Sequence, residues 1–126
     1  LDFFAGIGLF RVGLEQAGWT CKGHCEIDKY ANMSYEAMHN PKEDEWFEKD
    51  ITKVRADSLP DVDLWAGGFP CQDVSMAGER KGLYGERTGL FFEFVRLLRE
   101  RGDHKPWSST FAMQKHLSGG GFLAAA

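Results

Sequence analysis

The chain has little of what several protein classes need. Of its 126 residues, 15 are Lys or Arg and 19 are Asp or Glu, which gives a net charge of −4 at pH 7. Without an excess of positive charge there is no broad electrostatic footprint for nucleic acid, so any DNA-binding surface is local or missing. No apolar run approaches the ~20 residues that a membrane-spanning helix needs, and no signal peptide is visible. The composition therefore argues against a membrane-spanning protein and against a broadly basic one.

Cysteine is also scarce, and an initiator Met is absent. Three Cys, an odd number, argue against a disulfide framework and for a reducing compartment. The sequence opens inside an apolar run, "LDFFAG", so we expect that a segment upstream is missing. At 43% hydrophobic and 27% charged residues, the length suits a single domain with a packed core.

What is present is an alternation of strand-like and helix-like segments. The expected strands cover residues 1–4, 20–25, a short stretch ending at 50–51, and 62–66. The expected helices run from about Phe10 to a stop at Gly18, over 29–39, and over 87–101. Apolar residues recur at helical spacing in each helix: Phe10, Leu14 and Ala17; Tyr30, Met33 and Ala37; Leu90, Phe91, Phe94, Val95 and Leu98. This alternation predicts an α/β fold, a mostly parallel sheet with helices on both sides.

Two segments do not fit the alternation. Residues 41–50 read as a charged, solvated connection. Residues 107–126 contain a Gly triplet and an Ala triplet, and only 109–113 could form a further strand. We therefore divide the chain into residues 1–106 and a divergent tail, 107–126, with one strand at most.

A glycine turn and three acids are the first candidate site. Gly6 and Gly8 stand between a strand and a helix, where glycine lets the backbone approach a ligand. The third Gly of a dinucleotide fingerprint is absent, which disfavours a nicotinamide cofactor. Glu26, 20 residues after Gly6, could accept ribose hydroxyls or be a solvated acid, and the spacing favours the ribose role. Asp28 could merely cap the following helix. Asp50 could accept from an adenine amino group or be a loop acid, and the spacing does not decide.

The second candidate site is "GGFPCQDVS", residues 67–75, in a long glycine-rich loop that follows a strand. Its Cys71 would emerge at the same sheet edge as the glycine turn. The thiol could be a covalent nucleophile or a buried structural Cys, and the constrained loop favours the nucleophile. Cys21, His24 and Cys25 lack the second pair of ligands that zinc needs. We expect Cys21 and Cys25 to face one packed layer and predict no metal site.

The motifs together resemble one family. "DFFAGIGLFRVGLEQAG", "EID", "DI", "GGFPCQDVS" and "GLYGERTGLFFEFVRLL" follow one another in the order and spacing of the cytosine-5 DNA methyltransferases, over nearly all of residues 1–106. The resemblance implies a Rossmann-like domain that binds S-adenosylmethionine. It also implies attack of the Cys71 thiolate on carbon 6 of a flipped-out cytosine in double-stranded DNA, methyl transfer to carbon 5, and elimination. A restriction–modification enzyme of the bacterial cytoplasm or nucleoid is the expected setting.

The resemblance assigns a role to each matching residue. It implies that Cys71 is catalytic and that Gln72, Ser75 and Arg87 face the DNA. The implied cofactor contacts are Phe4, Ala5, Gly6 and Gly8 at the methionine end, Glu26 on the ribose, Ile27, Asp50 and Ile51 on adenine, and Gly68, Pro70 and Leu90 along the wall.

The sequence also departs from the family. Leu9 stands where many members have Gly, and Ile27 where some have an aromatic residue. No Glu-Asn-Val motif follows Pro106, and its Glu would help to activate the cytosine. We therefore expect the amino-terminal part of such an enzyme, truncated, and consider three hypotheses. The chain is a methyltransferase, a module that binds S-adenosylmethionine without activity, or a generic nucleotide-binding Rossmann unit in which Cys71 is structural. A carboxy-terminal fragment could complement it.

Overall fold

The computed structural model describes residues 1–68, 86–101, 112–116 and 119–125, and for 86–88, 112–116 and 119–125 it describes the backbone alone. The elements follow in the order β1 (Asp2–Phe3), α1 (Leu9–Gln16), β2 (Gly23–Cys25), α2 (Lys29–His39), β3 (Trp46–Glu48), the 3-10 turns η1 (Ile51–Lys53) and η2 (Ala56–Ser58), β4 (Leu64–Gly67), α3 (Glu86–Arg101), β5 (Ala112–His116) and β6 (Gly119–Ala125).

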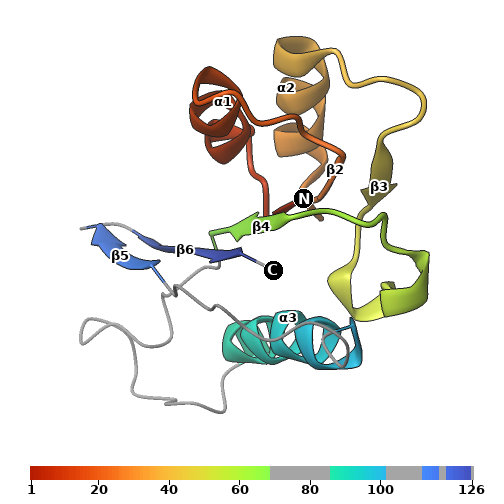
Figure 1. The fold of residues 1–126 in the computed structure, drawn as a ribbon, viewed down its shortest axis with the longest axis vertical. Helices are drawn as coiled ribbons and strands as arrows, with labels where there is room; N and C mark the ends of the chain where they lie inside the picture. The colour runs from red at the N-terminus through yellow and green to blue at the C-terminus, as the bar shows by residue number, and fades with distance from the viewer. Residues whose placement is uncertain (69–85, 102–111, 117–118, 126) are drawn as a thin grey trace.

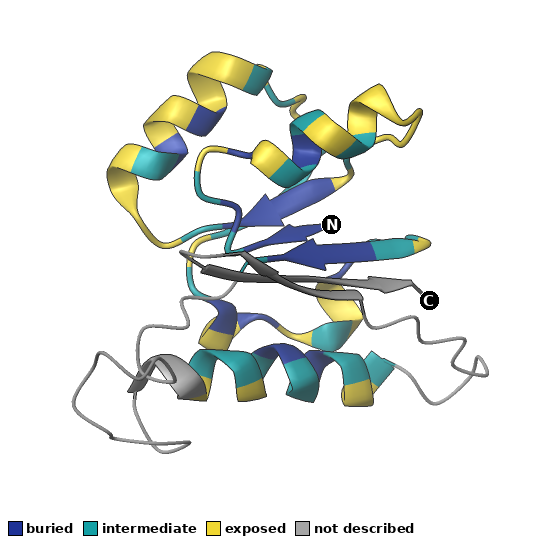
Figure 2. Cartoon of the chain, turned by 90° about the vertical axis from the view of Figure 1, so that its left-hand side faces the viewer, coloured by how far each residue is buried: buried dark blue, intermediate teal, exposed yellow. Residues whose placement is uncertain are grey.

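One sheet organises the fold, with the strand order β3-β2-β1-β4-β6-β5 (Figure 1). Strands β3, β2, β1 and β4 run parallel to one another, whereas β6 runs antiparallel to β4 and β5 antiparallel to β6. Helices α1 and α2 cover one face of the sheet and α3 covers the other (Figure 2). The predicted α/β architecture, a Rossmann-like and mostly parallel sheet between two helical layers, is confirmed.

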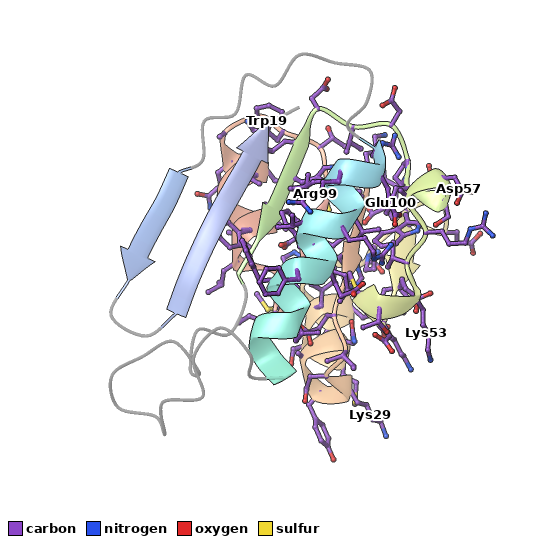
Figure 3. All side chains as sticks on the ribbon, turned by 90° about the horizontal axis from the view of Figure 1, so that it is seen from below. Trp19, Lys29, Lys53, Asp57, Arg99 and Glu100 are labelled. Carbon is purple, nitrogen blue, oxygen red and sulfur yellow. The ribbon has the colours of Figure 1, made fainter. Side chains whose placement is uncertain are left out.

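Helix α3 is tied to the two 3-10 turns that lead into β4. The Arg96 guanidinium donates to the carbonyl oxygens of Ile51 and Val54, at 3.4 and 3.1 Å. Arg101 donates likewise to the Leu59 carbonyl oxygen at 2.5 Å. The turns themselves carry outward-pointing charges such as Lys53 and Asp57 (Figure 3). These hydrogen bonds fix the connection between β3 and β4 against the helix, because they satisfy carbonyls that no strand pairs.

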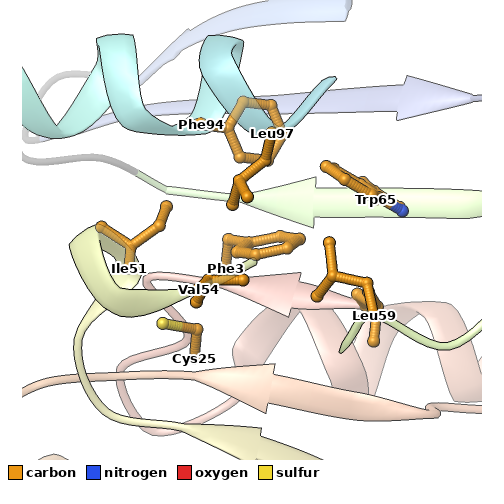
Figure 4. Close-up of a cluster of buried hydrophobic side chains, with 9 residues drawn as sticks. Phe3, Cys25, Ile51, Val54, Leu59, Trp65, Phe94 and Leu97 are labelled. Carbon is orange, nitrogen blue, oxygen red and sulfur yellow. The ribbon is translucent and has the colours of Figure 1, made fainter. Parts of the chain in front are cut away.

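The hydrophobic core lies between the sheet and α3 (Figure 4). Phe3 on β1 is fully buried, with ring centroids 5.0 Å from Trp65 on β4 and 5.2 Å from Phe94 on α3. Leu97, one turn after Phe94, is equally buried. Of the predicted apolar face of residues 87–101, Phe94 is buried and Leu90, Phe91 and Leu98 pack against the core, whereas the prediction missed Leu97. Truncating an aromatic residue such as Phe94 to Ala typically costs about 3–5 kcal/mol.

The opposite face of the sheet packs on polar side chains, and here the predicted stripes are wrong. Tyr30 is 74% exposed, and Met33 and Ala37 are exposed too, while α2 buries Asn32 and Tyr35 instead. On α1, the residue that the helix buries is Arg11, not Phe10, Leu14 or Ala17.

The buried residues of this face form a polar layer, defined here as Arg11, His24, Asn32, Tyr35 and Glu45. Arg11 donates to Glu45 at 2.7 Å and to the Tyr35 hydroxyl at 3.3 Å. Tyr35 stacks on His24 with ring centroids 3.8 Å apart. Because Arg11, Tyr35 and Asn32 find hydrogen-bond partners within this face, α2 can bury its polar side, which hydrophobic periodicity alone could not anticipate. Within the described residues, Nδ1 of His24 is left without a partner.

Two further expectations need correction. The third strand covers 46–48, inside the stretch predicted to be a solvated connection, whereas Asp50 and Ile51 begin a 3-10 turn. The tail holds two strands rather than one, at 112–116 and 119–125, and only residues 112–113 overlap the predicted strand. The second of these strands consists of Gly, Ala, Phe and Leu. It pairs with β4 through its backbone, a contact that composition does not reveal.

Candidate functional site

The loops that carry the predicted site residues leave the sheet along a single edge. Phe3 pairs with both Cys25 and Gly67, and Cys25 pairs with Glu48, so the carboxyl ends of the four parallel strands are level. The chain order reverses between β1 and β4, which are neighbours in the sheet. In open α/β sheets, ligands bind outside the carboxyl ends of the strands at such a reversal.

The glycine turn after β1 is tight and depends on its glycines. Gly6 and Gly8 have φ angles of +56° and +86°, and the Gly8 amide donates to the Ala5 carbonyl oxygen at 2.8 Å. A Cβ on Gly8 would lie 2.7 Å from the Tyr35 ring and still closer to that of His39. Residue 8 therefore needs glycine for its conformation and for the space beneath it. Phe4 also has a positive φ, 55°, and its side chain is half-buried.

Glu26 joins this turn directly. One carboxylate oxygen accepts from the Gly6 amide at 2.8 Å, and the other accepts from the Asp28 amide at 2.7 Å. A carboxylate can accept about four hydrogen bonds, so two lone-pair sites remain for a ligand. Asp28 itself accepts from the Ala31 amide at 2.7 Å, which confirms it as the N-cap of α2.

The other predicted adenine contacts follow the carboxyl ends of β2 and β3. Ile27 is 69% exposed, so its side chain is free to pack on a flat ring. The Asp50 carboxylate accepts from the Thr52 amide and hydroxyl, at 3.0 and 2.7 Å, and these bonds hold its pKa below the usual range. Ile51 is buried in the core, so only its backbone can face a ligand.

The second candidate site is described only at its borders. Gly68 follows β4, and its amide donates to the Phe3 carbonyl oxygen at 3.3 Å, which joins it to the end of β1. Leu90 on α3 is half-buried against the core. For Arg87, the structure describes the backbone on the first turn of α3. Pro70, Cys71, Gln72 and Ser75 lie outside the described residues.

Two residues that the sequence did not single out contact this edge. The side-chain amide of Asn32 donates to the Glu26 carbonyl oxygen at 2.7 Å, and Nε2 of His39 lies 2.9 Å from the Ile7 carbonyl oxygen. An available signal was Asn32 itself, because Asn is a poor helix former in a helix interior unless its side chain has a partner.

Cys21, His24 and Cys25 do not converge. Cys25 packs in the core beneath Phe3, and burial raises its pKa to about 12. Cys21 precedes β2, and its sulfur lies 3.7 Å from the Tyr35 hydroxyl on the opposite face. The expectation that both thiols face one layer is therefore wrong, because the strand begins only at Gly23 and alternation does not extend back to Cys21. Among the described residues, no group of three His, Cys, Asp or Glu could hold a metal ion.

A buried carboxylate lies behind the site, on β1. Neither oxygen of Asp2 has a hydrogen-bond partner in the part of the chain that the structure describes. Burial is the main reason that its pKa rises to about 7, and the positive charge of the N-terminal ammonium on Leu1 offsets this only in part. Burial likewise lowers the pKa of His24, so its imidazole is neutral at pH 7.

Known proteins match this chain over most of its length. The sequence model of the C-5 cytosine-specific DNA methylase family matches residues 1–105. The type II methyltransferase M.HhaI of Haemophilus parahaemolyticus is 43% identical over 101 residues, 80% of this chain and 30% of that protein. M.DsaV of Dactylococcopsis salina and M.NlaX of Neisseria lactamica, also type II methyltransferases, are each 40% identical over 94% of this chain.

The chain spans about a third of the length of these curated relatives, 30% to 37%. The alignments with M.DsaV and M.NlaX cover 119 and 121 residues, so they reach beyond the 105 residues that the family model matches. Among the residues that the structure describes, no helix is both long enough and apolar enough to cross a membrane.

Proposed function

Because this chain belongs to the C-5 cytosine-specific DNA methylase family, we propose that it binds S-adenosylmethionine at the carboxyl edge of its sheet and presents Cys71 to a cytosine in DNA. The observation that carries this proposal is the hydrogen bond between Glu26 and the Gly6 amide. It brings the predicted ribose acceptor and the glycine turn into one place, beside the strand that leads to Cys71.

The described residues fit the cofactor. Glu26 keeps two acceptor sites for the ribose hydroxyls, and Ile27 offers an exposed apolar surface to adenine. The Asp50 carboxylate stands one strand further along the edge and is ionised at neutral pH, which suits an amino group. Gly6 has open space where a Cβ would lie, so the backbone can approach the methionine end. Bound there, S-adenosylmethionine supplies an electrophilic methyl group on a sulfonium.

The chemistry that we assign to the loop after β4 is nucleophilic. The sequence places Cys71 three residues after Gly68, whose amide is bonded to the end of β1. A chain advances at most about 3.6 Å per residue, so the Cα atom of Cys71 can be no more than about 11 Å from that of Gly68. As a thiolate, Cys71 would add to carbon 6 of the cytosine, carbon 5 would take the methyl group and lose its proton, and the thiolate would then leave. The base must be extruded from the duplex to reach it.

A second function, cofactor binding without transfer, is favoured by one feature of the sequence. Addition to the ring builds negative charge that an acid must neutralise, and residues 107–126, which follow Pro106, contain no Glu-Asn-Val motif. For this chain on its own we therefore expect binding and no turnover.

Trapping with duplex DNA that contains 5-fluorocytosine separates the two functions, because fluorine at carbon 5 prevents the final elimination. The chain would be incubated with mixed-sequence duplexes and S-adenosylmethionine, and adducts would be detected by mass spectrometry. An adduct that forms with the unaltered chain and with Cys21→Ser, but not with Cys71→Ser, would establish transfer. Cofactor binding without any adduct would establish the second function. An adduct that persists in Cys71→Ser would contradict the role of Cys71.

A further inference from the structure

Asn32 lies one helical turn behind the cofactor edge and is only 6% exposed. It is the fourth residue of α2, and its side chain points inward to the end of β2 rather than to solvent. Its amide nitrogen donates to the Glu26 carbonyl oxygen at 2.7 Å and to the Asp28 carbonyl oxygen at 3.0 Å. Both hydrogens of one side-chain amide therefore hold the two ends of the short segment 26–28.

That segment sets the direction of the Glu26 carboxylate. One carboxylate oxygen accepts from the amide of Asp28 within the same segment, and the other reaches across to Gly6. If the backbone of 26–28 turned, these two hydrogen bonds could not both persist. The orientation of the carboxylate thus depends on the backbone that Asn32 holds.

His24 fixes the orientation of the Asn32 amide in turn. Its Nε2 lies 3.2 Å from the Asn32 side-chain oxygen, and its ring is stacked on Tyr35 and packed against Phe47. A neutral imidazole with its proton on Nε2 donates to that oxygen. The amide is then oriented with its nitrogen toward Glu26 and Asp28. No other partner of the Asn32 oxygen competes for it within the described residues.

We propose that Asn32 is a positioning residue for ribose recognition: it holds the 26–28 segment so that Glu26 presents its free lone pairs to both ribose hydroxyls. The inference rests on the proposed function, because it presumes a ribose at Glu26. Asn32 itself does not contact the ligand.

The test compares two ligands on two forms of the full chain. S-adenosylhomocysteine carries both ribose hydroxyls, and its 2′,3′-dideoxy analogue carries neither. For the unaltered chain we expect the analogue to bind roughly tenfold more weakly or worse, since it forfeits hydrogen bonds to a charged group. In Asn32→Ala the ratio of the two dissociation constants, analogue over S-adenosylhomocysteine, should fall to about threefold or less, because a displaced carboxylate cannot favour the hydroxyls. Asn40→Asp, at the other end of α2, serves as the control and should keep the full ratio.

The ratio separates positioning from general damage, since a loss of stability weakens both ligands equally. Asn32→Ser keeps a hydroxyl donor and replaces Asn32→Ala if the latter does not melt cooperatively; it should also show a reduced ratio. A full ratio in either folded variant would overturn the inference while the proposed function stands. Failure of the unaltered chain to bind S-adenosylhomocysteine would instead overturn the proposed function, and the inference with it.

Discussion

The Glu26 carboxylate accepts a hydrogen bond from the Gly6 amide at 2.8 Å, across 20 residues of sequence. This contact joins the end of β2 to the turn after β1, so the acid and the glycines act as one unit. Binding a ribose at Glu26 would therefore use a carboxylate whose direction is already set by a backbone hydrogen bond.

Replacing this acid should weaken cofactor binding without unfolding the chain. In Glu26→Gln, the amide keeps one acceptor but loses the charge that strengthens hydrogen bonds to ribose. We expect the affinity for S-adenosylhomocysteine to fall roughly tenfold or more, equivalent to ~1.5–3 kcal/mol. Glu43→Gln, an exposed acid between α2 and β3, should bind as the unaltered chain does. Equal affinities of both variants by isothermal titration calorimetry would reject the ribose role of Glu26.

Two glycines near α1 should respond to alanine in opposite ways. Gly8→Ala forces a side chain to φ +86° and into contact with Tyr35 and His39. The conformation alone costs about 1–2 kcal/mol. Gly13, in the helix, has open space around its Cβ position, and Gly13→Ala should stabilise by about 0.5–1 kcal/mol. Urea midpoints at unchanged slope would measure both effects. A Gly8→Ala chain as stable as the unaltered one would show that the turn is looser than described.

The buried ion pair of Arg11 and Glu45 should matter far more than an exposed one. Arg11 is 7% exposed, so Arg11→Ala leaves the Glu45 carboxylate buried without its partner. Such a loss typically costs about 3–5 kcal/mol. Arg55, 78% exposed and paired with Asp57, is the matched control, and Arg55→Ala should leave the free energy of unfolding almost unchanged, because solvent screens an exposed ion pair. Similar losses in the two variants would contradict the structural role of the polar layer.

The free energy of unfolding should depend on pH because of the buried Asp2. Its pKa is about 7 in the folded chain against 3.8 as the usual value, so between these pH values the folded state holds a proton that the unfolded state has lost. Stability therefore falls as pH rises from about 4 to 7, by up to about 4 kcal/mol from this group. The decrease ends above pH 7.

Asp2→Asn removes this dependence. The stability of the variant relative to the unaltered chain should increase with pH across that range and level off above it, as measured by urea unfolding at a series of pH values. A constant difference between the two chains from pH 4 to 8 would mean that Asp2 is not buried as a protonated acid.

Hydrophobic spacing in the sequence predicted the helices of the fold better than it predicted which of their faces are buried. Hydrophobic spacing located α2 and α3, and the pair Gly6 and Gly8 located the turn before α1. The same spacing predicted the wrong face of α2. Asn32 and Tyr35 are buried because Asn32 hydrogen-bonds to His24 and Tyr35 to Arg11, not because they are apolar. Periodicity measures apolarity, and it cannot detect a polar group that has found its partners.

The sequence likewise predicted some residues of the candidate site and missed others. The Glu26–Gly6 contact followed from a spacing typical of nucleotide-binding sheets, and the structure brings those two residues together. Asn32 and His39 were missed because their partners are backbone carbonyls, at Glu26 and Ile7, and a carbonyl has no identity in a sequence. The strand at 46–48 was missed because Glu48 and its charged neighbours are typical of a solvated connection. An edge strand of a sheet, however, can form with its side chains only partly buried.

The decisive measurement is a calorimetric titration of the full 126-residue chain with S-adenosylhomocysteine and, separately, with NAD. We predict saturable binding of S-adenosylhomocysteine at one site per chain and no detectable binding of NAD, because the turn lacks the third glycine of a diphosphate site. Binding of NAD in preference to S-adenosylhomocysteine, or no binding of S-adenosylhomocysteine by a cooperatively folded chain, would contradict the assignment of the carboxyl edge as an S-adenosylmethionine site.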